Sequence, residues 1–567
     1  MSIFEEISQI KQQLLHPQSP FALTVDERTE LPVYQNAAST MISMIQTART
    51  ESDETFLVYR DMSWTFNEFY QAVDNLASYL QSQDVQPGDK IALAMRNRPE
   101  WCIAFVAIVM VGAIPAPVNS FCQGDELIAA FEDVSACAVI CDYERCQRVA
   151  QFQDRLPSLI ISIDGGTDTV CAVDFYEALA FPSCAYHTPA VTSYEDALIL
   201  FTSGATSWAK PVVSSHQAVC QSIFNINYIS ALSGMCSADI VQAMQATQLP
   251  PVTLTAVPLF HVSGLHAQFL SNLVNQRKMV FIHKWDLDDV LQTMVDERVT
   301  VFNGAPSMVK QLIEHPDFVA RGLDKQVYGM GFGGAGIPEK VMQNVLSMMS
   351  NKMVGSGFGM TETNGAVSAG SGRIFNKFPK ASGVVCPIMQ VRTVNDDNRP
   401  LATGEVGELQ VKSITVMRTY LGQDTSDTLS EDGWLSTGDI GFVDEHQLIH
   451  IVDRKKDVIN RAGENISAAE VESCISLFPG ITEVAVVGCP DEALGECVVA
   501  VLYTPLGDAL DIEAVLSYCR KHLASFKVPC KILVSASPLP RNPAGKLLKN
   551  LIKEYYLHPD QAVGALV

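Results

Sequence analysis

Residues 90–118, KIALAMRNRPEWCIAFVAIVMVGAIPAPV, contain three apolar runs whose lengths decide the fold class. Lys90–Met95 and Ile114–Val118 are short and typical of buried strands, whereas Pro99–Val111 is long enough for a buried helix. A strand, a helix and a second strand in this order predict a βαβ unit with parallel strands. The segment is short for a membrane span and two prolines interrupt its end, so we interpret it as part of a folded core.

The sequence on both sides repeats this alternation. Thr65 and Glu68 have the spacing of a capping box, and apolar residues follow at helical intervals, so a helix is predicted from this point. The stretch ACAVICD (136–142) and the apolar run Asp196–Thr202 are strand-like. The predicted fold class is therefore α/β, with a large N-terminal domain of helices and mostly parallel sheets.

The character of the chain changes near residue 453. The charged run DRKKD (453–457) is followed by a second capping-box spacing at Ser467 and Glu470. Beyond it, short apolar strands mix with helices over about a hundred residues, which is enough for an independent unit. We predict a large domain over residues 1–453 and a small, mobile α+β domain over residues 454–567, with a hinge at the charged run.

Composition restricts the partners and the location. The 567-residue chain has 39 Lys and Arg against 63 Asp and Glu, and its formal net charge of −24 repels nucleic acid and anionic lipid surfaces. Local cations can still make one cleft attractive to a small anion such as ATP. The 15 cysteines are scattered without metal-binding spacing, and the N-terminus has no basic stretch that leads into an apolar run. We therefore expect reduced thiols, a cytoplasmic location and no integral membrane segment.

The loop TSGATSWAKP (202–211) follows an apolar strand and offers hydroxyls, a glycine and one lysine. Backbone N–H groups, hydroxyls and an ammonium group in such a loop can bind phosphate oxygens. It is not a Walker loop, because no glycine precedes Lys210 and no Ser or Thr follows it. Taken alone, the pattern fits an ordinary Ser/Thr-rich turn equally well.

Six further motifs follow this loop in a fixed order. They are PLFHVSG (258–264), GGAGIP (333–338), GFGMTET (357–363), GWLSTGD (433–439), DRKKDVINRAGENISAAEVE (453–472) and PLPRNPAGK (538–546). Together the seven resemble the signatures of the adenylate-forming superfamily, which comprises acyl- and aryl-CoA synthetases, peptide-synthetase adenylation domains and luciferases. The resemblance covers nearly the whole chain and is nearest to fatty acyl-CoA synthetases.

The resemblance implies an activity. A carboxylic acid would be activated with ATP and Mg²⁺ as its acyl-adenylate, and the acyl group would then pass to the thiol of coenzyme A. Residues 1–453 would bind ATP and the acid, and residues 454–567 would form a lid that carries a catalytic lysine. Because both reactants are anionic, this chemistry needs cations and oriented dipoles around the phosphates.

The resemblance also implies roles for individual residues. The β- and γ-phosphates of ATP would be bound by Thr202, Ser203, Gly204, Thr206 and Lys210, and the α-phosphate would lie near Thr361. Glu362 would bind Mg²⁺, Phe358 would lie against the adenine, and Asp439 and Arg454 would bind the ribose. Gly334 would also contact the nucleotide. Lys546 would stabilise negative charge during adenylation, Lys456 would be the hinge, and Gly463 would line the approach of the thiol. The acyl slot is expected at His261, Gly264, Gly333 and Ala335, with Gly334 beside it.

Two departures from the family pattern affect the interpretation. His261 stands where amino-acid-activating relatives have an Asp that pairs the α-ammonium group, so a plain carboxylic acid is preferred. The expected acyl slot and the resemblance of the N-terminal hundred residues to fatty acyl-CoA synthetases favour a fatty or similar apolar acid. In the phosphate loop, Ser207, Ala209 and Pro211 replace the usual residues; a Ser with positive φ costs about 1 kcal/mol, and Pro211 favours an extended Lys210. The departures in the phosphate loop keep open the alternative of a catalytically impaired acyl- or nucleotide-binding protein. No carrier-domain serine motif follows Lys546, so transfer to a separate holo-acyl carrier protein stays open as the alternative to coenzyme A.

Other motifs carry less weight. Residues 331–336 fit GxGxxG, but no acidic residue lies about twenty positions further on, as a dinucleotide site requires. His446 and His450 flank a strand-like stretch without a third metal ligand, so we interpret them as surface histidines. No GxSxG or HExxH motif is present.

Overall fold

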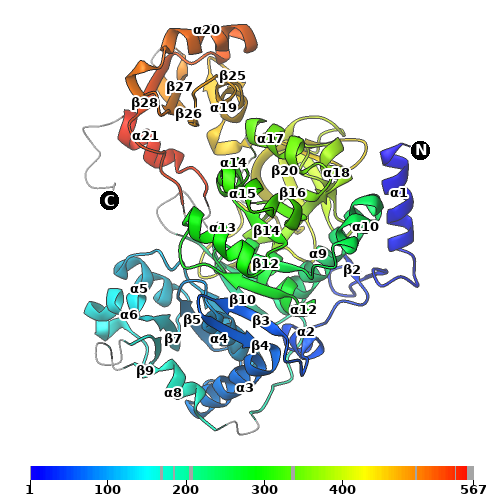
Figure 1. Ribbon diagram of the computed structural model, residues 1–567, viewed down its shortest axis with the longest axis vertical. Helices are drawn as coiled ribbons and strands as arrows, with labels where there is room; N and C mark the ends of the chain where they lie inside the picture. Colours follow the sequence, from blue (N-terminus) through cyan, green and yellow to red (C-terminus); the bar gives the residue numbers. More distant parts are fainter. Residues whose placement is uncertain are drawn as a thin grey trace.

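The structure, a computed structural model, describes residues 2–165, 170, 172–182, 186–202, 209–333, 337, 339–491, 494–542 and 545–557. Figure 1 shows a large body with a small unit, coloured orange to red, at one end of it. This arrangement confirms the α/β class with a large N-terminal and a small C-terminal part.

A five-stranded parallel sheet contains the βαβ unit predicted from residues 90–118. Its order is β6-β5-β7-β8-β9, with β5 (Lys90–Ala94), β6 (Ile114–Pro117), β7 (Ala138–Asp142), β8 (Leu159–Ile163) and β9 (Val173–Asp174). Helix α4 (Pro99–Met110) connects β5 to β6 and is buried along its whole length, because it packs against β5 on one side and against β3 of a second sheet on the other. The prediction of a buried helix between parallel strands is confirmed.

A nine-stranded sheet forms the centre of the body. Its order is β18-β17-β16-β15-β14-β12-β13-β3-β4, with β3 (Thr55–Tyr59), β4 (Met62–Thr65), β12 (Val252–Thr255), β13 (Lys278–Phe281), β14 (Val301–Gly304), β15 (Gly329–Phe332), β16 (Met353–Met360), β17 (Gly365–Ser371) and β18 (Val384–Val385). Strands β16, β15, β14, β12, β13 and β3 are parallel, and antiparallel strands complete both ends. Two of the predicted motifs follow β12 and β15, and a third, GFGMTET, spans the end of β16, so all three lie at the same edge of the sheet.

The strand predicted at Asp196–Thr202 is present, but it pairs antiparallel and does not extend the parallel pattern. Three smaller sheets are antiparallel, and their pairing was not predicted. They are β1 (Leu23–Val25) with β2 (Pro32–Tyr34); β10 (Asp196–Phe201), β11 (Pro211–Ser215) and β21 (Thr419–Tyr420); and β19 (Gln390–Val394), β20 (Gly407–Lys412), β22 (Leu435–Val443) and β23 (Ile449–Arg454). The second sheet flanks the phosphate loop, and the third carries Asp439 and Arg454 as directly paired residues of β22 and β23.

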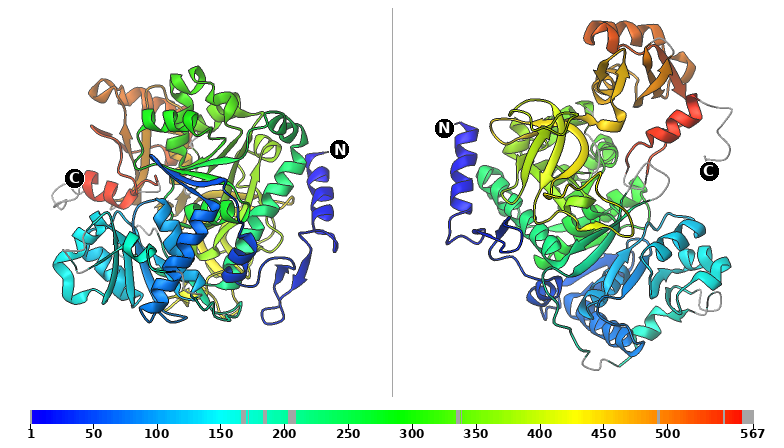
Figure 2. Two further views of the ribbon diagram at one scale, coloured as in Figure 1. Left: turned by 60° about the horizontal axis from the view of Figure 1, so that its bottom comes forward. Right: turned by 180° about the vertical axis from the view of Figure 1, so that it is seen from behind.

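Helices cover the sheets of the body, as Figure 2 shows from two further sides. The α-helices are α1 (Ile3–Leu14), α2 (Met41–Ala48), α3 (Phe66–Ser82), α5 (Gly124–Asp133), α6 (Tyr143–Val149), α8 (Phe175–Leu179), α9 (His216–Cys236), α10 (Ala238–Ala246), α11 (Val262–Gly264), α12 (Ser271–Val274), α13 (Leu287–Asp296), α14 (Pro306–Glu314), α15 (Pro316–Ala320), α16 (Leu323–Gln326), α17 (Glu339–Met349) and α18 (Arg373–Lys377). The body also contains the 3-10 turns η1 (Ala150–Arg155) and η3 (Thr361–Thr363) and the π-helical turn η2 (Leu265–Leu270). The predicted capping box at Thr65 and Glu68 starts α3, as expected.

The small unit is built on one sheet, β25-β24-β27-β26, with β28 parallel to β27. Its elements are β24 (Ile459–Arg461), β25 (Glu464–Ile466), α19 (Ala468–Ser476), β26 (Glu483–Asp491), β27 (Gly495–Tyr503), η5 (Gly507–Ala509), α20 (Ile512–His522), η6 (Ser525–Lys527), β28 (Lys531–Ser535) and α21 (Lys549–Leu557). The turn η4 (Lys455–Asp457) joins it to β23 of the body. The predicted domain division between residues 453 and 454 stays a prediction.

The question of a membrane span, raised by the apolar segment after Pro99, can be checked on the helices. Among the described residues, none forms a helix with the length and apolar character that crossing a membrane requires.

Candidate active site

The motif loops of the body meet the small unit at the edge of the nine-stranded sheet. Gly545 lies against the start of α14, because a Cβ built on it would lie 2.6 Å from the Cβ of Ala305 and 3.5 Å from Ser307 Oγ. Ala305 directly follows β14, between the motif loops of β12 and β15. The loop that carries Lys546 is thus seated on the edge where the sheet-end motifs gather.

Glu362 is a buried carboxylate in the turn η3, directly after β16. It is 8% exposed, and Tyr420 Oη donates a 2.9 Å hydrogen bond to its Oε1. Its backbone is also fixed, since Met417 N donates to its carbonyl oxygen at 2.7 Å. Burial raises the pKa of Glu362, and no Lys or Arg of the described residues forms an ion pair with it. A hard cation would compensate this buried charge.

Asp439 and Arg454 form an ion pair across two antiparallel strands. Arg454 Nε lies 2.8 Å from Asp439 Oδ1, and the two residues are register partners of β22 and β23. The other oxygen, Oδ2, is buried and has no hydrogen-bond partner in the described part of the chain. Burial raises the pKa of Asp439 to about 6. A buried acceptor without a donor indicates a place where a ligand hydroxyl can donate.

Lys546 belongs to a tight loop of the small unit that its own neighbours hold in shape. Asn542 Oδ1 accepts from Lys546 N at 2.9 Å, Asn542 N donates to the carbonyl oxygen of Lys546 at 2.8 Å, and Arg541 Nη1 donates to the carbonyl oxygen of Gly545 at 2.8 Å. Burial lowers the pKa of Lys546 to about 8, and the nearby cations Arg454 and Lys456 lower it further. The ammonium group is therefore partly withdrawn from water, and it lies near the cations Arg454 and Lys456 as well as the carboxylates Asp439 and Asp457.

Lys210 lies at the end of the phosphate loop, where β11 begins. Its N–H donates to Thr202 Oγ1 at 3.0 Å, and Thr202 N donates back to the Lys210 carbonyl oxygen at 3.0 Å. The ammonium group lies 4.7 Å from the centre of the Tyr420 ring. The ladder between Thr202 and Lys210 supports the predicted extended geometry before Pro211, and Tyr420 links Lys210 to Glu362.

These charged groups act on one another, which places five of the predicted motifs in one site. The cations of Arg454 and Lys210 oppose the upward shift in the pKa of Glu362. Arg454 and Lys546 have the same effect on the pKa of Asp439, and Asp439 in turn supports the charge of Lys546. Two buried carboxylates and three cations thus share one region, as the joining of two anions requires.

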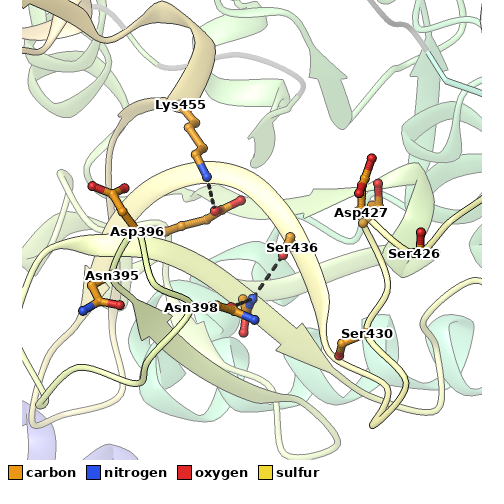
Figure 3. Close-up of a pocket in the computed structure, with 11 residues that line it drawn as sticks. Asn395, Asp396, Asn398, Ser426, Asp427, Ser430, Ser436 and Lys455 are labelled. Carbon is orange, nitrogen blue, oxygen red and sulfur yellow. Dashed lines mark hydrogen bonds and ion pairs between the residues drawn. The ribbon is translucent and has the colours of Figure 1, made fainter.

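The charged run that was predicted as the hinge lies beside this site and borders a polar pocket of about 200 Å³, drawn in Figure 3. The pocket is lined by Asn395, Asp396, Asn398, Glu408, Gln410, Ser426, Asp427, Thr428, Ser430, Ser436 and Lys455, none of which was predicted as a site residue. Lys455 Nζ points to Glu408 Oε2 at 2.7 Å, as the dashed line shows. The next residue, Lys456, is exposed, and its role as the hinge stays a prediction. The ion pair fixes the chain to the body immediately before that residue.

The residues predicted for the acyl group and the adenine are placed differently from one another. His261 Nε2 is buried without a partner in the described residues, and burial lowers the pKa of His261 to about 4, so the ring is neutral near pH 7. The Cα of Gly264 faces backbone, since a Cβ there would lie 2.2 Å from the Pro258 carbonyl oxygen, whereas a Cβ on Gly333 would meet nothing within 4 Å. Phe358 is 9% exposed and belongs to a hydrophobic cluster with Val367. The ligand contacts of these residues stay predictions.

Gly463 is placed in the turn between β24 and β25. It has a φ of +88°, and a Cβ on it would meet nothing within 4 Å, so its outer face is open. Asn460 Oδ1 accepts from its N–H at 3.2 Å. The predicted contact with an incoming thiol stays a prediction. Ser203, Gly204, Thr206, Gly334 and Ala335, and with them Ser207, lie outside the described residues.

Two contributors to the site were missed from the sequence. Tyr420 links Glu362 to Lys210, and Ala305 receives the Lys546 loop. Neither lies in one of the seven motifs, and no local spacing marks them, because both act through contacts with residues far away in the chain. Thr361, which was predicted, is half-buried in η3 with its carbonyl oxygen accepting from Asn364 N at 3.0 Å.

The residues present fit a divalent cation that is shared with phosphate. Within the part of the chain that the structure describes, no group of three or more His, Cys, Asp or Glu side chains could hold a metal ion by itself. Mg²⁺ is commonly held by one or two carboxylates together with substrate phosphates and water, so Glu362 alone suffices on the protein side.

Comparisons with known proteins agree with this geometry. Residues 45–421 match the AMP-binding enzyme family, and residues 470–546 match the AMP-binding enzyme C-terminal domain. The chain is 30% identical to 3-[(3aS,4S,7aS)-7a-methyl-1,5-dioxo-octahydro-1H-inden-4-yl]propanoyl:CoA ligase of Rhodococcus jostii, covering 92% of this chain and 99% of that one. It is 28% identical to the long-chain-fatty-acid–CoA ligase FadD13 of Mycobacterium tuberculosis, covering 88% and 94%. ATP-bound MatB from Rhodopseudomonas palustris has the same fold, with a TM-score of 0.81, 24% identity and coverage of 92% and 99%.

The buried carboxylates, the cations around them and these relatives define an acid–thiol ligase of the AMP-forming class. The chain belongs to the AMP-binding enzyme family.

Proposed function

We propose that this enzyme activates a carboxylic acid with an apolar acyl chain, such as a fatty acid, as its acyl-adenylate and then forms the coenzyme A thioester. The observation that carries the proposal is the gathering of Glu362, the Asp439–Arg454 pair, Lys210 and Lys546 in one site. These five residues come from five different motifs that are far apart in the chain. Their side chains nevertheless lie in one region, which a shared function explains.

In the first step, the chain's own groups would bind and orient ATP and the acid. Asp439 Oδ2 would accept from the ribose, because it is the buried oxygen that lacks a donor. Glu362, held by Tyr420, would bind Mg²⁺, which supplies positive charge as pyrophosphate leaves. Lys546, seated by the contact of Gly545 with Ala305, would neutralise the charge that accumulates between the carboxylate and the α-phosphate.

In the second step, the small unit would swing about Lys456 and bring the turn of Gly463 to the thiol. The ion pair between Lys455 and Glu408 keeps the chain attached to the body up to the hinge. The open outer face of Gly463 leaves room for a thiol to pass. Coenzyme A is proposed as the acceptor because the named relatives are CoA ligases.

The proposed acid is apolar and lacks an α-amino group. His261 is neutral and offers no carboxylate to an ammonium group, and an unpaired cation in a buried pocket is costly. The relatives act on acids as different as a long-chain fatty acid and a bicyclic propanoate, so the choice among apolar acids rests with experiment.

A pyrophosphate-release assay with a panel of acids, with and without coenzyme A, tests the proposal. We expect acid-dependent release with ATP and Mg²⁺ and a thioester product when coenzyme A is present. An α-amino acid of matched side chain should be activated at least tenfold more slowly than the plain acid. If no acid in a panel of fatty, bicyclic and aromatic members stimulates release, the enzyme does not have the proposed activity. If only amino acids do, the assigned substrate class is wrong.

A further inference from the structure

Three cysteine side chains lie next to one another on the sheet of the small unit. They are Cys489 in β26, Cys497 in β27 and Cys530 directly before β28. The thiol of Cys497 is in hydrogen-bond contact with the thiols of both Cys489 and Cys530, so it is the central member. None of the three belongs to the motifs of the proposed reaction.

The backbone geometry suits a covalent bond between two of them. Cys489 and Cys497 are register partners in the antiparallel pair of β26 and β27. Directly opposed residues of such a pair have Cα atoms about 4.5–5.5 Å apart, which lies within the range of about 4.4–6.8 Å that disulfides occupy. Cys530 is held beside them, because its N–H donates to the Val498 carbonyl oxygen at 2.9 Å. The bond can therefore form without rearrangement of the sheet.

The surroundings divide the three thiols into one entry point and two protected members. Cys530 is exposed, whereas Cys489 and Cys497 are half-buried. Burial raises the pKa of Cys489, and burial together with the neighbouring Cys530 thiol raises the pKa of Cys497 to about 11. Lys531 and Lys553 lie close enough to Cys489 to favour its thiolate. An oxidant from solution therefore meets Cys530 first.

We propose that Cys489, Cys497 and Cys530 form a thiol–disulfide exchange site that reacts with low-molecular-weight disulfides and ends with a bond between Cys489 and Cys497. The Cys530 thiolate attacks a disulfide RSSR, which gives Cys530–S–S–R and releases RS⁻. Cys497 then attacks the Cys530 sulfur and releases the second RS⁻, and Cys489 attacks the Cys497 sulfur and returns Cys530 as a thiol. Two protein thiols are oxidised, RSSR is reduced to two RSH, and the protons of the two thiols go to the two RS⁻ groups.

The final bond would lie in the hairpin that supports the turn of Gly463. One residue pair further along, Glu496 Oε2 accepts from Asn460 N at 2.8 Å, and the Leu494 carbonyl oxygen accepts from Ala462 N at 2.7 Å. The exchange site is thus connected by one hairpin to the loop that the proposed function assigns to the thiol. The chemistry of the site itself does not depend on that assignment.

The test is incubation of the whole protein with glutathione disulfide, followed by alkylation of the remaining thiols and peptide mapping by mass spectrometry. We expect a peptide pair joined through Cys489 and Cys497, which disappears on reduction with dithiothreitol. Cys497→Ser should form no bond among these residues and should accumulate glutathione on Cys530. Cys489→Ser should stop with Cys497 joined to Cys530. Cys530→Ser should slow formation of the Cys489–Cys497 bond at least tenfold.

Cys137→Ser is the matched control, because Cys137 is an exposed cysteine of the body. It should form the Cys489–Cys497 bond at the unchanged rate. Thermal unfolding of each variant checks that the small unit is intact. The proposal is overturned if Cys489 and Cys497 of the wild-type protein remain fully alkylatable after oxidation. It is also overturned if Cys530→Ser reacts as fast as the wild-type protein.

Discussion

Substitution of Gly545 by alanine tests whether the small unit must be seated on the body for adenylation. Gly545 has a φ of +81°, and its added Cβ would lie 2.6 Å from the Cβ of Ala305, closer than carbon atoms approach. The left-handed backbone costs an alanine about 1–2 kcal/mol in every arrangement of the lid. Overpacking against Ala305 adds about 1–3 kcal/mol, but only while the loop is seated.

The overpacking against Ala305 determines the direction and size of the expected loss of activity. About 1–3 kcal/mol corresponds to a roughly 5- to 150-fold loss of acid-driven ATP–pyrophosphate exchange, which reports adenylate formation. Conversion of a synthetic acyl-adenylate to the thioester with coenzyme A does not require the seated loop, and its rate should fall much less. Gly545→Ala should therefore separate the two half-reactions.

A second substitution provides the control. Ala305→Gly removes the atom that the new Cβ would meet, and glycine is tolerated at the start of a helix such as α14, where Ala305 makes no side-chain cap. The double variant should recover most of the lost exchange activity, while Ala305→Gly alone should be nearly unchanged. Equal losses in both half-reactions that Ala305→Gly does not relieve would refute the seating of Lys546 by this contact.

Three further predictions concern the charged groups of the site. Lys546→Ala should slow adenylate formation by at least a hundredfold with little change in ATP affinity. Because the pKa of Lys546 is lowered to about 8, kcat/KM for exchange by the wild-type enzyme should fall as the pH rises through that value. Lys546→Arg should keep its activity at higher pH, since arginine stays protonated there. Asp439→Asn should weaken binding of ATP about tenfold or more and reduce the discrimination against 2′,3′-dideoxy-ATP, whereas unchanged discrimination would exclude the ribose as the partner of Oδ2. Tyr420→Phe removes the donor to Glu362 and should raise the Mg²⁺ concentration for half-maximal activity about fivefold, while Tyr228→Phe, whose hydroxyl has no partner in the described chain, should not.

Local sequence patterns predicted the elements that depend on local physics. The βαβ unit at residues 90–118 and the capping box at Thr65 were confirmed, because strand length, helix length and cap chemistry are properties of a short window. The antiparallel sheet of β19, β20, β22 and β23 was not predicted. Its strands are at least as long as those of the βαβ unit, but their pairing depends on partners that no short window of sequence contains.

The same distinction applies to the site. Glu362 and Lys546 could be proposed from motifs, since the family resemblance assigns them one at a time. Tyr420 could not, because its role arises from a hydrogen bond across 58 positions of the chain. The contact between Ala305 and Gly545 is of the same kind, and it depends on how two units of the protein meet rather than on either sequence alone.

The balance of forces at the lid explains why closure would follow the arrival of the substrates. Asp453 favours the seated arrangement, because its Oδ2 accepts from Ser467 Oγ at 2.9 Å and from Ala469 N at 3.2 Å at the start of α19. The lowered pKa of Lys546 shows that burying this ammonium group near Arg454 opposes the same arrangement. An anion bound between Lys546 and Arg454 would raise the pKa of Lys546 and offset the cost of burying its ammonium group. Because such an anion binds the closed arrangement more tightly than the open one, it shifts the equilibrium toward closure. In the proposed mechanism, ATP and the acid therefore supply the charge that makes the closed lid favourable, and departure of pyrophosphate removes part of it before the thiol step.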